Sequence, residues 1–124
     1  MQLISEAYWV MKNLLKLDNG EMSSVFSQWN EGKLRSYLIE ITANILQHKD
    51  KSGGYLIDKI LDTAGQKGTG KWSVINAMEL GMPLGLDCYG CFERSLSAQK
   101  ELRKSAAGHF TCRRTEVVYN KSEW

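Results

Sequence analysis

Apolar residues recur every three or four positions along the first part of the chain. One such stripe precedes the first turn-forming residues: Leu3, Ile4, Ala7, Val10, Met11, Leu14 and Leu17. This spacing places the side chains on one face of an α-helix. The turn sequence Asp18-Asn19-Gly20 follows the stripe. The pattern therefore predicts a first helix from Met1 to about Lys16, because such residues commonly end a helix.

The apolar pattern of residues 21–49 predicts two further helices. The first runs from about Glu21 to Asn30, and Gly32 stops it; its buried residues are Val25, Phe26 and Trp29. The second runs from Lys33 to Lys49 and has a wide apolar face made of Leu34, Tyr37, Leu38, Ile41 and Ile45, which Ile39, Ala43 and Leu46 extend. A helix with apolar residues on most of its circumference is buried on several sides.

The second half of the chain also has helical periodicity. Apolar residues Val74, Ile75, Met78 and Met82 predict a helix from about Trp72 to Leu80, ended by Gly81 and Pro83. A further helix is expected from Phe92 to Lys104, and residues from Gly108 onward are expected to be irregular. No segment has the alternating pattern of a strand, so the predicted fold class is all-α.

A glycine-rich loop separates the two sets of predicted helices. Residues 65–71, Gly-Gln-Lys-Gly-Thr-Gly-Lys, hold two lysines, a threonine and three glycines. Glycines let backbone N–H groups approach a ligand closely, and ammonium and hydroxyl groups donate further hydrogen bonds to an oxyanion. The helix predicted after the loop adds the positive end of its dipole. This composition predicts a phosphate-binding loop.

Two other interpretations of the loop are open. Gly65 to Lys71 satisfies the start of a nucleotide-binding P-loop, G-x-x-x-x-G-K, but Trp72 stands where that motif needs Ser or Thr to bind magnesium. The residues before it, Tyr55 to Asp62, do not have the β-branched run of a buried strand. Taken alone, the loop also fits a solvated surface turn.

The segment from Ile60 to Trp72 resembles the signature of decarboxylating 6-phosphogluconate dehydrogenases, in which Asp and then Ala-Gly-Gln-Lys-Gly-Thr-Gly-x-Trp follow an aliphatic residue. Segments on both sides match the helical domain of that family in the same order: Ile4 to Tyr8, Trp29 to Gly32, Leu34 with Ser36 to Thr42, Asp58 to Ile60, and Ala77 to Gly81 with Pro83. The resemblance covers about Met1 to Arg103.

The resemblance implies an enzyme of the pentose phosphate pathway. Members of this family oxidise 6-phosphogluconate with NADP and release carbon dioxide to give ribulose 5-phosphate, and they act as homodimers. Carried over by motif, Lys67 and Thr69 in the KGTG segment and Arg94 in Phe92 to Ser97 would bind the substrate phosphate. A guanidinium suits this role because it donates two parallel hydrogen bonds to one phosphate.

Other parts of the family pattern are not found. No G-x-G-x-x-G with an acidic ribose ligand is present, so the resemblance implies an incomplete helical domain without the Rossmann domain. The family's catalytic lysine and glutamate precede the segment that matches Ile4 to Tyr8. We therefore expect a fragment or truncated copy with no catalytic or cofactor-binding residue, inactive alone. The predicted division is 1–104 for the helical domain and 105–124 for a divergent, irregular tail.

Length and charge limit the other possible functions. The chain of 124 residues has a formal net charge of +2, which gives no reason to expect a nucleic-acid partner. No apolar stretch reaches the length of a membrane span, and the first residues do not have the basic start of a signal peptide. A cytoplasmic protein is expected.

The cysteines and a histidine leave one metal-binding hypothesis open. Cys88 and Cys91 form C-x-x-C, and His109 and Cys112 form H-x-x-C, a set that could bind zinc tetrahedrally. Reduced cytosolic thiols are the favoured interpretation, with no metal site. A further alternative is a helical interaction module without catalysis, because helices that lose their packing partners leave apolar stripes exposed.

Overall fold

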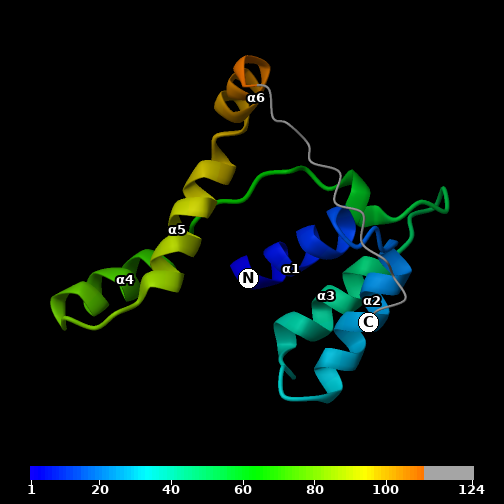
Figure 1. Ribbon diagram of the computed structural model, residues 1–124, viewed down its shortest axis with the longest axis horizontal. Coiled ribbons are helices and arrows are strands. Elements are labelled where there is room, and N and C mark those ends of the chain that lie inside the picture. Colours follow the sequence, from blue (N-terminus) through cyan, green and yellow to red (C-terminus); the bar gives the residue numbers. More distant parts are fainter. Residues whose placement is uncertain (111–124) are drawn as a thin grey trace. The chain divides into compact units, whose positions relative to one another are not determined.

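A computed structural model describes residues 1–110 of the chain. The regular elements of this range are helical, apart from an isolated antiparallel bridge between Lys49 and Tyr55. In order they are α1 (Gln2–Asn13), α2 (Asn19–Glu31), α3 (Tyr37–Gln47), the short 3₁₀ helix η1 (Leu56–Lys59), α4 (Thr69–Glu79), α5 (Gly85–Ala98) and α6 (Lys100–His109) (Figure 1). The predicted all-α fold class is confirmed for the described residues.

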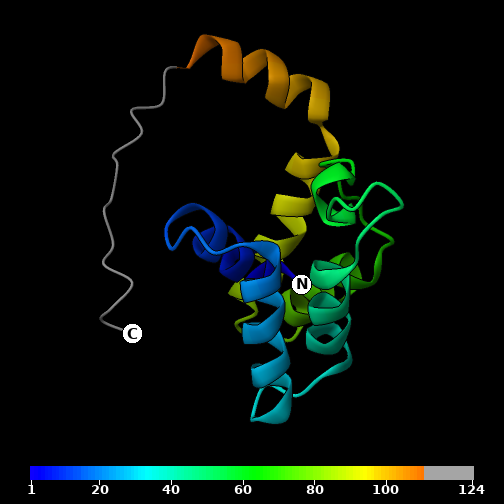
Figure 2. The ribbon, with the colours of Figure 1, turned by 90° about the vertical axis from the view of Figure 1, so that its right-hand side faces the viewer.

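The described residues divide into two compact units, an N-terminal unit of residues 1–60 and a C-terminal unit of residues 61–110. In the N-terminal unit, α2 and α3 lie side by side and α1 packs against α2 (Figures 1 and 2). Their contact buries an apolar core made of Met11, Met22, Phe26, Ile39, Ala43 and Leu46. The hydroxyl of Ser23 joins the two helices by donating a hydrogen bond of 2.8 Å to the carbonyl oxygen of Ala43.

The observed end of α1 and start of α2 differ from the predicted positions. The Asp18 side chain accepts a hydrogen bond from the backbone N–H of Glu21, whose carboxylate accepts one from the N–H of Asp18. This capping box starts α2 at Asn19, two residues earlier than predicted, because it satisfies N–H groups that a helix start leaves unpaired. The first helix ends at Asn13 rather than at Lys16, which has a left-handed φ of 55°.

The third helix is shorter at both ends than predicted. The sequence predicts residues 33–49, whereas α3 covers residues 37–47. Its start is set by Ser36, whose hydroxyl accepts a hydrogen bond of 3.3 Å from the backbone N–H of Ile39. Serine is a favoured N-cap because its side chain replaces the missing intrahelical acceptor.

A polar contact attaches η1 to the first two helices. Asp58 accepts hydrogen bonds from the Lys12 ammonium at 2.6 Å and from the Asn19 side-chain amide at 2.8 Å. The Lys12 ammonium, and to a smaller extent the Asn19 amide, lower the pKa of Asp58 below its usual value. The Lys12 pKa is raised by the same pair. The carboxylate thus adds an ionic contact beside the apolar core.

In the C-terminal unit, α4 packs against α5. The first helix of this unit begins at Thr69 and not at Trp72, because Gly68 adopts a left-handed φ of 100° that ends the loop and serves as N-cap. An ideal Cβ placed on Gly70 would lie 2.8 Å from the Sγ atom of Cys91, so the backbone of α4 approaches α5 very closely here. A side chain at this position would therefore require the Cys91 thiol or the helices to shift, since real Cβ atoms do not come so near another atom.

The helix predicted over residues 92–104 is found as parts of two helices. α5 begins seven residues earlier than predicted, at Gly85, and the chain leaves helical geometry at Gln99, with φ −91° and ψ 54°. α6 then continues to His109, so it crosses the predicted domain boundary between residues 104 and 105. Residues 105–109, which were expected to be irregular, are therefore helical, and residues 111–124 of the predicted tail lie outside the described range.

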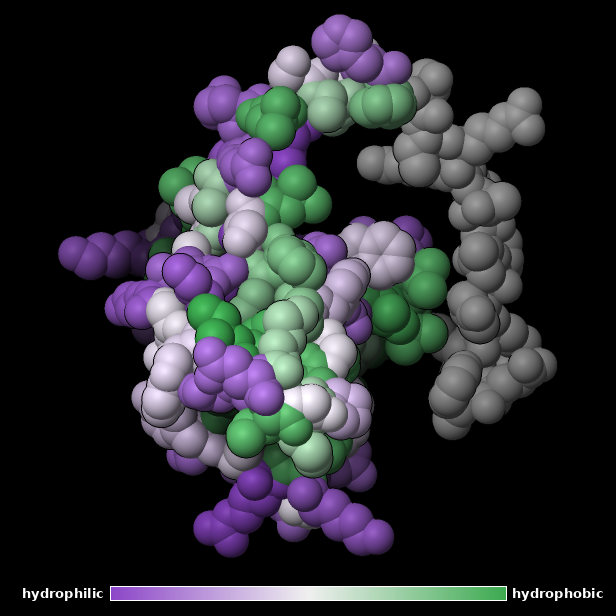
Figure 3. Space-filling view, turned by 90° about the vertical axis from the view of Figure 1, so that its left-hand side faces the viewer, coloured by the Kyte–Doolittle hydropathy of each residue, from purple (hydrophilic) through white to green (hydrophobic). Residues whose placement is uncertain are grey.

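Large apolar side chains remain exposed on the C-terminal unit. Those of α4 and α5 are Trp72, Ile75, Met78, Leu86, Tyr89, Phe92 and Leu96. Figure 3 shows apolar surface between polar patches on the side of the molecule where α4 lies in Figure 1.

Within residues 1–110, no helix combines the length and the apolarity that crossing a membrane requires.

The buried core of the N-terminal unit predicts a strong effect of Leu46→Ala. Leu46 is fully buried, so truncation removes apolar contacts and leaves a cavity, which costs about 2–5 kcal/mol in the free energy of unfolding. Leu34→Ala is the matched control because Leu34 is 56% exposed, and it should change stability by no more than about 0.5 kcal/mol. Urea denaturation followed by circular dichroism measures both values. Equal effects of the two variants would contradict the assigned core.

The close approach of α4 to α5 predicts a penalty for Gly70→Ala. Alanine normally stabilises a helix relative to glycine, but here its Cβ would force the Cys91 thiol to turn or the helices to separate. We expect a net loss of about 1 kcal/mol, typical of mild overpacking, seen as a lower midpoint in thermal unfolding. Gly85→Ala is the control, because nothing lies within 4 Å of its Cβ position, and it should not destabilise.

The double variant Gly70→Ala/Cys91→Ala tests the cause of that penalty. Removal of the sulfur atom should restore most of the stability lost in Gly70→Ala. If Gly70→Ala were as stable as Gly85→Ala, the close contact between the two helices would be refuted.

Candidate functional site

The glycine-rich loop runs along α5 and is attached to it by side chains from both segments. Gln66 Nε2 donates hydrogen bonds to the carbonyl oxygen of Cys91 and, at 2.9 Å, to the hydroxyl of Ser95. Arg94 Nη1 donates a hydrogen bond of 3.5 Å to the carbonyl oxygen of Gly65. The contact residues on α5 are three and four positions apart, so they share one face of the helix.

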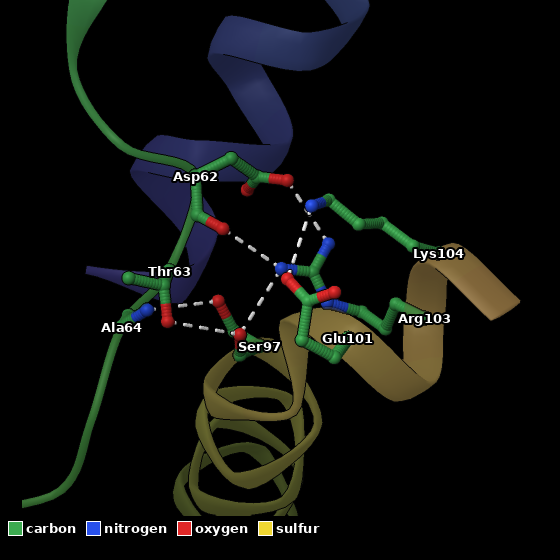
Figure 4. Close-up of polar contacts among 7 residues, drawn as sticks. All are labelled: Asp62, Thr63, Ala64, Ser97, Glu101, Arg103 and Lys104. Atoms are coloured by element: carbon green, nitrogen blue, oxygen red, sulfur yellow. Dashed lines mark hydrogen bonds and ion pairs between the residues drawn. The ribbon is translucent and has the colours of Figure 1, made fainter.

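The upstream end of the loop is attached to the last turn of α5. Ser97 accepts hydrogen bonds from Thr63 Oγ1 at its carbonyl oxygen (3.2 Å) and from the Ala64 N–H at its hydroxyl (3.0 Å). Arg103 on α6 donates to the carboxylate of Asp62 at 2.9 Å and to the carbonyl oxygens of Asp62 and Ser97 at 2.8 and 3.0 Å (Figure 4). Its guanidinium also lowers the pKa of Asp62 below the usual value.

The downstream end of the loop leads into the N-terminus of α4. Thr69 is the first residue of this helix and Gly70, which touches Cys91, is the second. The first N–H groups of a helix have no intrahelical partner, and no side chain caps them in α4. They carry a partial positive charge that attracts anions.

The order of these contacts shows that loop and helix run in opposite directions. From upstream to downstream, residues 63–64 contact Ser97, residues 65–66 contact Arg94 and Ser95, and residue 70 contacts Cys91. The Arg94 guanidinium therefore lies beside the same loop that carries Lys67. Loop residues 61–73 are exposed to solvent, which leaves this end of α4 open to a ligand.

The three residues predicted as phosphate ligands all belong to the C-terminal unit: Lys67 lies in the loop, Thr69 at the start of α4 and Arg94 on α5. Lys67 and Thr69 are exposed and flank the left-handed Gly68, and half-buried Arg94 contacts the loop at Gly65. An ammonium, a hydroxyl, a guanidinium and open N–H groups are all hydrogen-bond donors. Such a set can bind an oxyanion, because each donor can reach a different oxygen or lone pair.

Sequence reasoning did not identify the residues that hold the loop in place. Gln66, Ser97 and Arg103 were not predicted to take part in the site. Each nevertheless forms a hydrogen bond between the loop and a helix, α5 or α6. Gln66 lies within the recognised loop motif, which was the available signal for it. The roles of Ser97 and Arg103 depend on the break at Gln99, which the helical periodicity did not predict.

The alternative interpretations of the loop and the cysteines find little support. A P-loop needs a strand before its glycines, whereas the element before this loop is the 3₁₀ helix η1.

Cys88 and Cys91 are half-buried free thiols on α5. Within residues 1–110 no three His, Cys, Asp or Glu side chains come together as a metal site. Cys112, the fourth residue of the zinc hypothesis, lies outside the described residues.

A dinucleotide does not fit any element of the described chain. The phosphates of NADP are normally held where a glycine-rich turn joins a strand to a helix. Residues 1–110 contain helices and one isolated bridge, and hence no such strand. We therefore assign NADP binding to none of residues 1–110.

Comparisons with known proteins agree with the family that the loop motif indicates. The family described as "6-phosphogluconate dehydrogenase, C-terminal domain" matches residues 1–124, beyond Arg103 where the recognised motifs end. The decarboxylating 6-phosphogluconate dehydrogenase of Haemophilus ducreyi is 48% identical over 124 residues, covering all of this chain and 26% of that protein. The decarboxylating enzyme 2 of Saccharomyces cerevisiae is 54% identical over 107 residues, covering 86% of this chain and 22% of that protein.

A solved structure gives the same result. The Plasmodium falciparum 6-phosphogluconate dehydrogenase, studied in its apo form, with its cofactor NADP+ and with its substrate 6-phosphogluconate, superposes with a TM-score of 0.86 and 50% identity. The match covers 99% of this chain and 26% of that one. The chain thus spans about a quarter of the length of the relatives that it matches. Loop, helical fold and sequence identity together show that this chain belongs to the 6-phosphogluconate dehydrogenase family and corresponds to part of its C-terminal domain.

Proposed function

We propose that this chain carries the phosphate-binding part of a 6-phosphogluconate site. The whole protein would then be an NADP-dependent dehydrogenase that oxidises and decarboxylates 6-phosphogluconate to ribulose 5-phosphate. The observation that supports the proposal is the hydrogen bond from Arg94 to Gly65, in the same loop that carries Lys67 and leads to Thr69 at the start of α4. A sugar-acid phosphate offers the oxygens that these donors need.

The phosphate is bound by opposite charge and by hydrogen bonds. In this proposal Lys67 and Arg94 supply the positive charge, and Thr69 donates its hydroxyl hydrogen. The N–H groups at the start of α4 add donors whose direction the helix fixes. Charge-assisted hydrogen bonds contribute about 1.5–3 kcal/mol each, so this part of the site alone should bind with roughly millimolar affinity.

We assign no proton or hydride transfer to the described residues. The loop binds and orients the phosphate end of the substrate, which does not react. Binding energy from this end can help to hold the reacting atoms in place. In this proposal the chain alone does not turn over 6-phosphogluconate. A cytoplasmic location accords with a soluble sugar phosphate as substrate.

We also propose that the exposed apolar side chains of α4 and α5 are covered in a homodimer of the whole enzyme. Met78 and Phe92 are 72% and 68% exposed, which is unusual for such large apolar residues on an isolated soluble domain. A non-catalytic interaction module is the second candidate function, and the same exposed residues favour it.

The proposed phosphate site predicts selective loss of ligand binding in Lys67→Ala. The wild-type chain, isotopically labelled for nuclear magnetic resonance, should bind 6-phosphogluconate and not gluconate, because gluconate has no phosphate. In Lys67→Ala the dissociation constant should rise by about tenfold or more, the loss expected for one charge-assisted hydrogen bond. In an enzyme that contains the whole domain, the KM for 6-phosphogluconate should rise while NADP binding is unchanged.

Lys51→Ala is the matched control for the loss of one positive charge. Lys51 is exposed and also precedes a glycine-containing turn, but it belongs to the N-terminal unit. This variant should bind 6-phosphogluconate as the wild type does. Equal binding of gluconate, or an unchanged dissociation constant in Lys67→Ala, would overturn the proposed site.

Sedimentation tests whether the exposed apolar surface of α4 and α5 mediates association. If the apolar faces are covered in the enzyme dimer, the chain should associate with itself or with a dehydrogenase subunit of its family, and Phe92→Glu should weaken that association because it adds a charge to the face. A chain that stays monomeric and ignores such subunits would contradict both candidates for this surface.

A further inference from the structure

The break between α5 and α6 is a point where the loop and both helices are joined by hydrogen bonds. Helical geometry ends at Gln99, and a helix end leaves carbonyl oxygens without the partner that the next turn would supply. The carbonyl oxygen of Ser97 instead accepts hydrogen bonds from Thr63 of the loop and from Arg103 of α6. One acceptor thus joins three segments of the C-terminal unit.

Arg103 makes the most extensive contacts at this break. One arm of its guanidinium donates to the carboxylate of Asp62 at 2.9 Å, and the other donates to the Asp62 carbonyl oxygen at 2.8 Å (Figure 4). The Arg103 side chain is 29% exposed and the Asp62 side chain is 74% exposed. The guanidinium is therefore sheltered, and it holds the backbone of residue 62 as well as its charge, which an ammonium could not do with the same geometry.

The attachment at residue 62 determines where the rest of the loop lies. Ala64, two residues further on, donates its N–H to the Ser97 hydroxyl. Gln66 then bonds to Ser95, two residues earlier on α5, and Lys67 is the next residue. Because the loop runs against the direction of α5, its first contact sets the register of all later ones.

We propose that Arg103 is a positioning residue for the phosphate-binding loop. By clamping Asp62 to the end of α5, it sets the register of residues 62–66 on the helix and so holds Lys67 beside Arg94 before the phosphate arrives. A loop that is already ordered loses less conformational freedom on binding, which raises affinity without a new contact to the ligand. This inference rests on the proposed phosphate site.

The test compares Arg103→Gln with Arg103→Lys and Lys104→Gln in the full 124-residue chain. Arg103→Gln removes the charge and the fork, and Arg103→Lys keeps only the charge. Lys104→Gln is the control, because it removes a charge from the next residue of α6, whose ammonium pairs with the Glu101 carboxylate at 3.0 Å. Two quantities are measured by nuclear magnetic resonance: the backbone order parameters of residues 62–66, and the dissociation constant of 6-phosphogluconate.

In Arg103→Gln we expect the order parameters of Ala64 and Gln66 to fall from about 0.85, a rigid backbone, to below about 0.6. Those of α4 and α5 should not change, and the dissociation constant should rise by about fivefold because the loop must be ordered on binding. Arg103→Lys should fall between the wild type and Arg103→Gln, and Lys104→Gln should match the wild type.

A rigid loop in Arg103→Gln with α5 intact would overturn the inference. If that variant unfolds, Arg103→Lys decides the matter, since it keeps the charge but cannot hold the carboxylate and the carbonyl oxygen of Asp62 together; an unchanged loop and unchanged affinity would then refute the clamp. The failure of the proposed function is a separate result: it appears as a wild-type chain that does not bind 6-phosphogluconate, whatever the order parameters show.

Discussion

The attachment of the glycine-rich loop to α5 is the constraint on which the candidate site depends. The loop residues are exposed and flexible by composition, so neither apolar burial nor regular hydrogen bonding orders them. Their positions come from side-chain contacts with a single helix, α5, at Ser97, Ser95 and Cys91. A helix is a rigid support, and a loop that follows it can present ligands at a defined spacing.

Two kinds of interaction at the ends of the loop complete this arrangement. At one end the left-handed backbone of Gly68 turns the chain into α4, and the absence of a side chain at Gly70 allows α4 to approach Cys91. At the other end, an ionic and hydrogen-bonded contact between Arg103 and Asp62 attaches the loop to the last turn of α5. The two glycines therefore allow the loop and α4 to lie close to α5 at one end. The ion pair between Arg103 and Asp62 holds the loop against α5 and α6 at the other, more exposed end.

The N-terminal unit is held together differently. Met22, Phe26 and Leu46 are fully buried between α2 and α3, and the capping box at Asp18 orders the start of α2. This unit has its own core and does not use the contacts of the phosphate loop. Large apolar side chains remain exposed on the C-terminal unit, whereas the largest apolar side chains of this core are fully buried.

Helical periodicity and one motif were enough to predict the all-α class and the family. Periodicity succeeds for a helix such as α3 because its buried side chains are set by local spacing. It did not predict that Asn19 begins α2, that Gln99 separates α5 from α6, or that α6 extends to His109, because capping and helix breaks depend on a few hydrogen bonds. Only the tertiary structure decided the partners of Arg103, since Asp62 lies 41 positions away in the chain and no local pattern relates them.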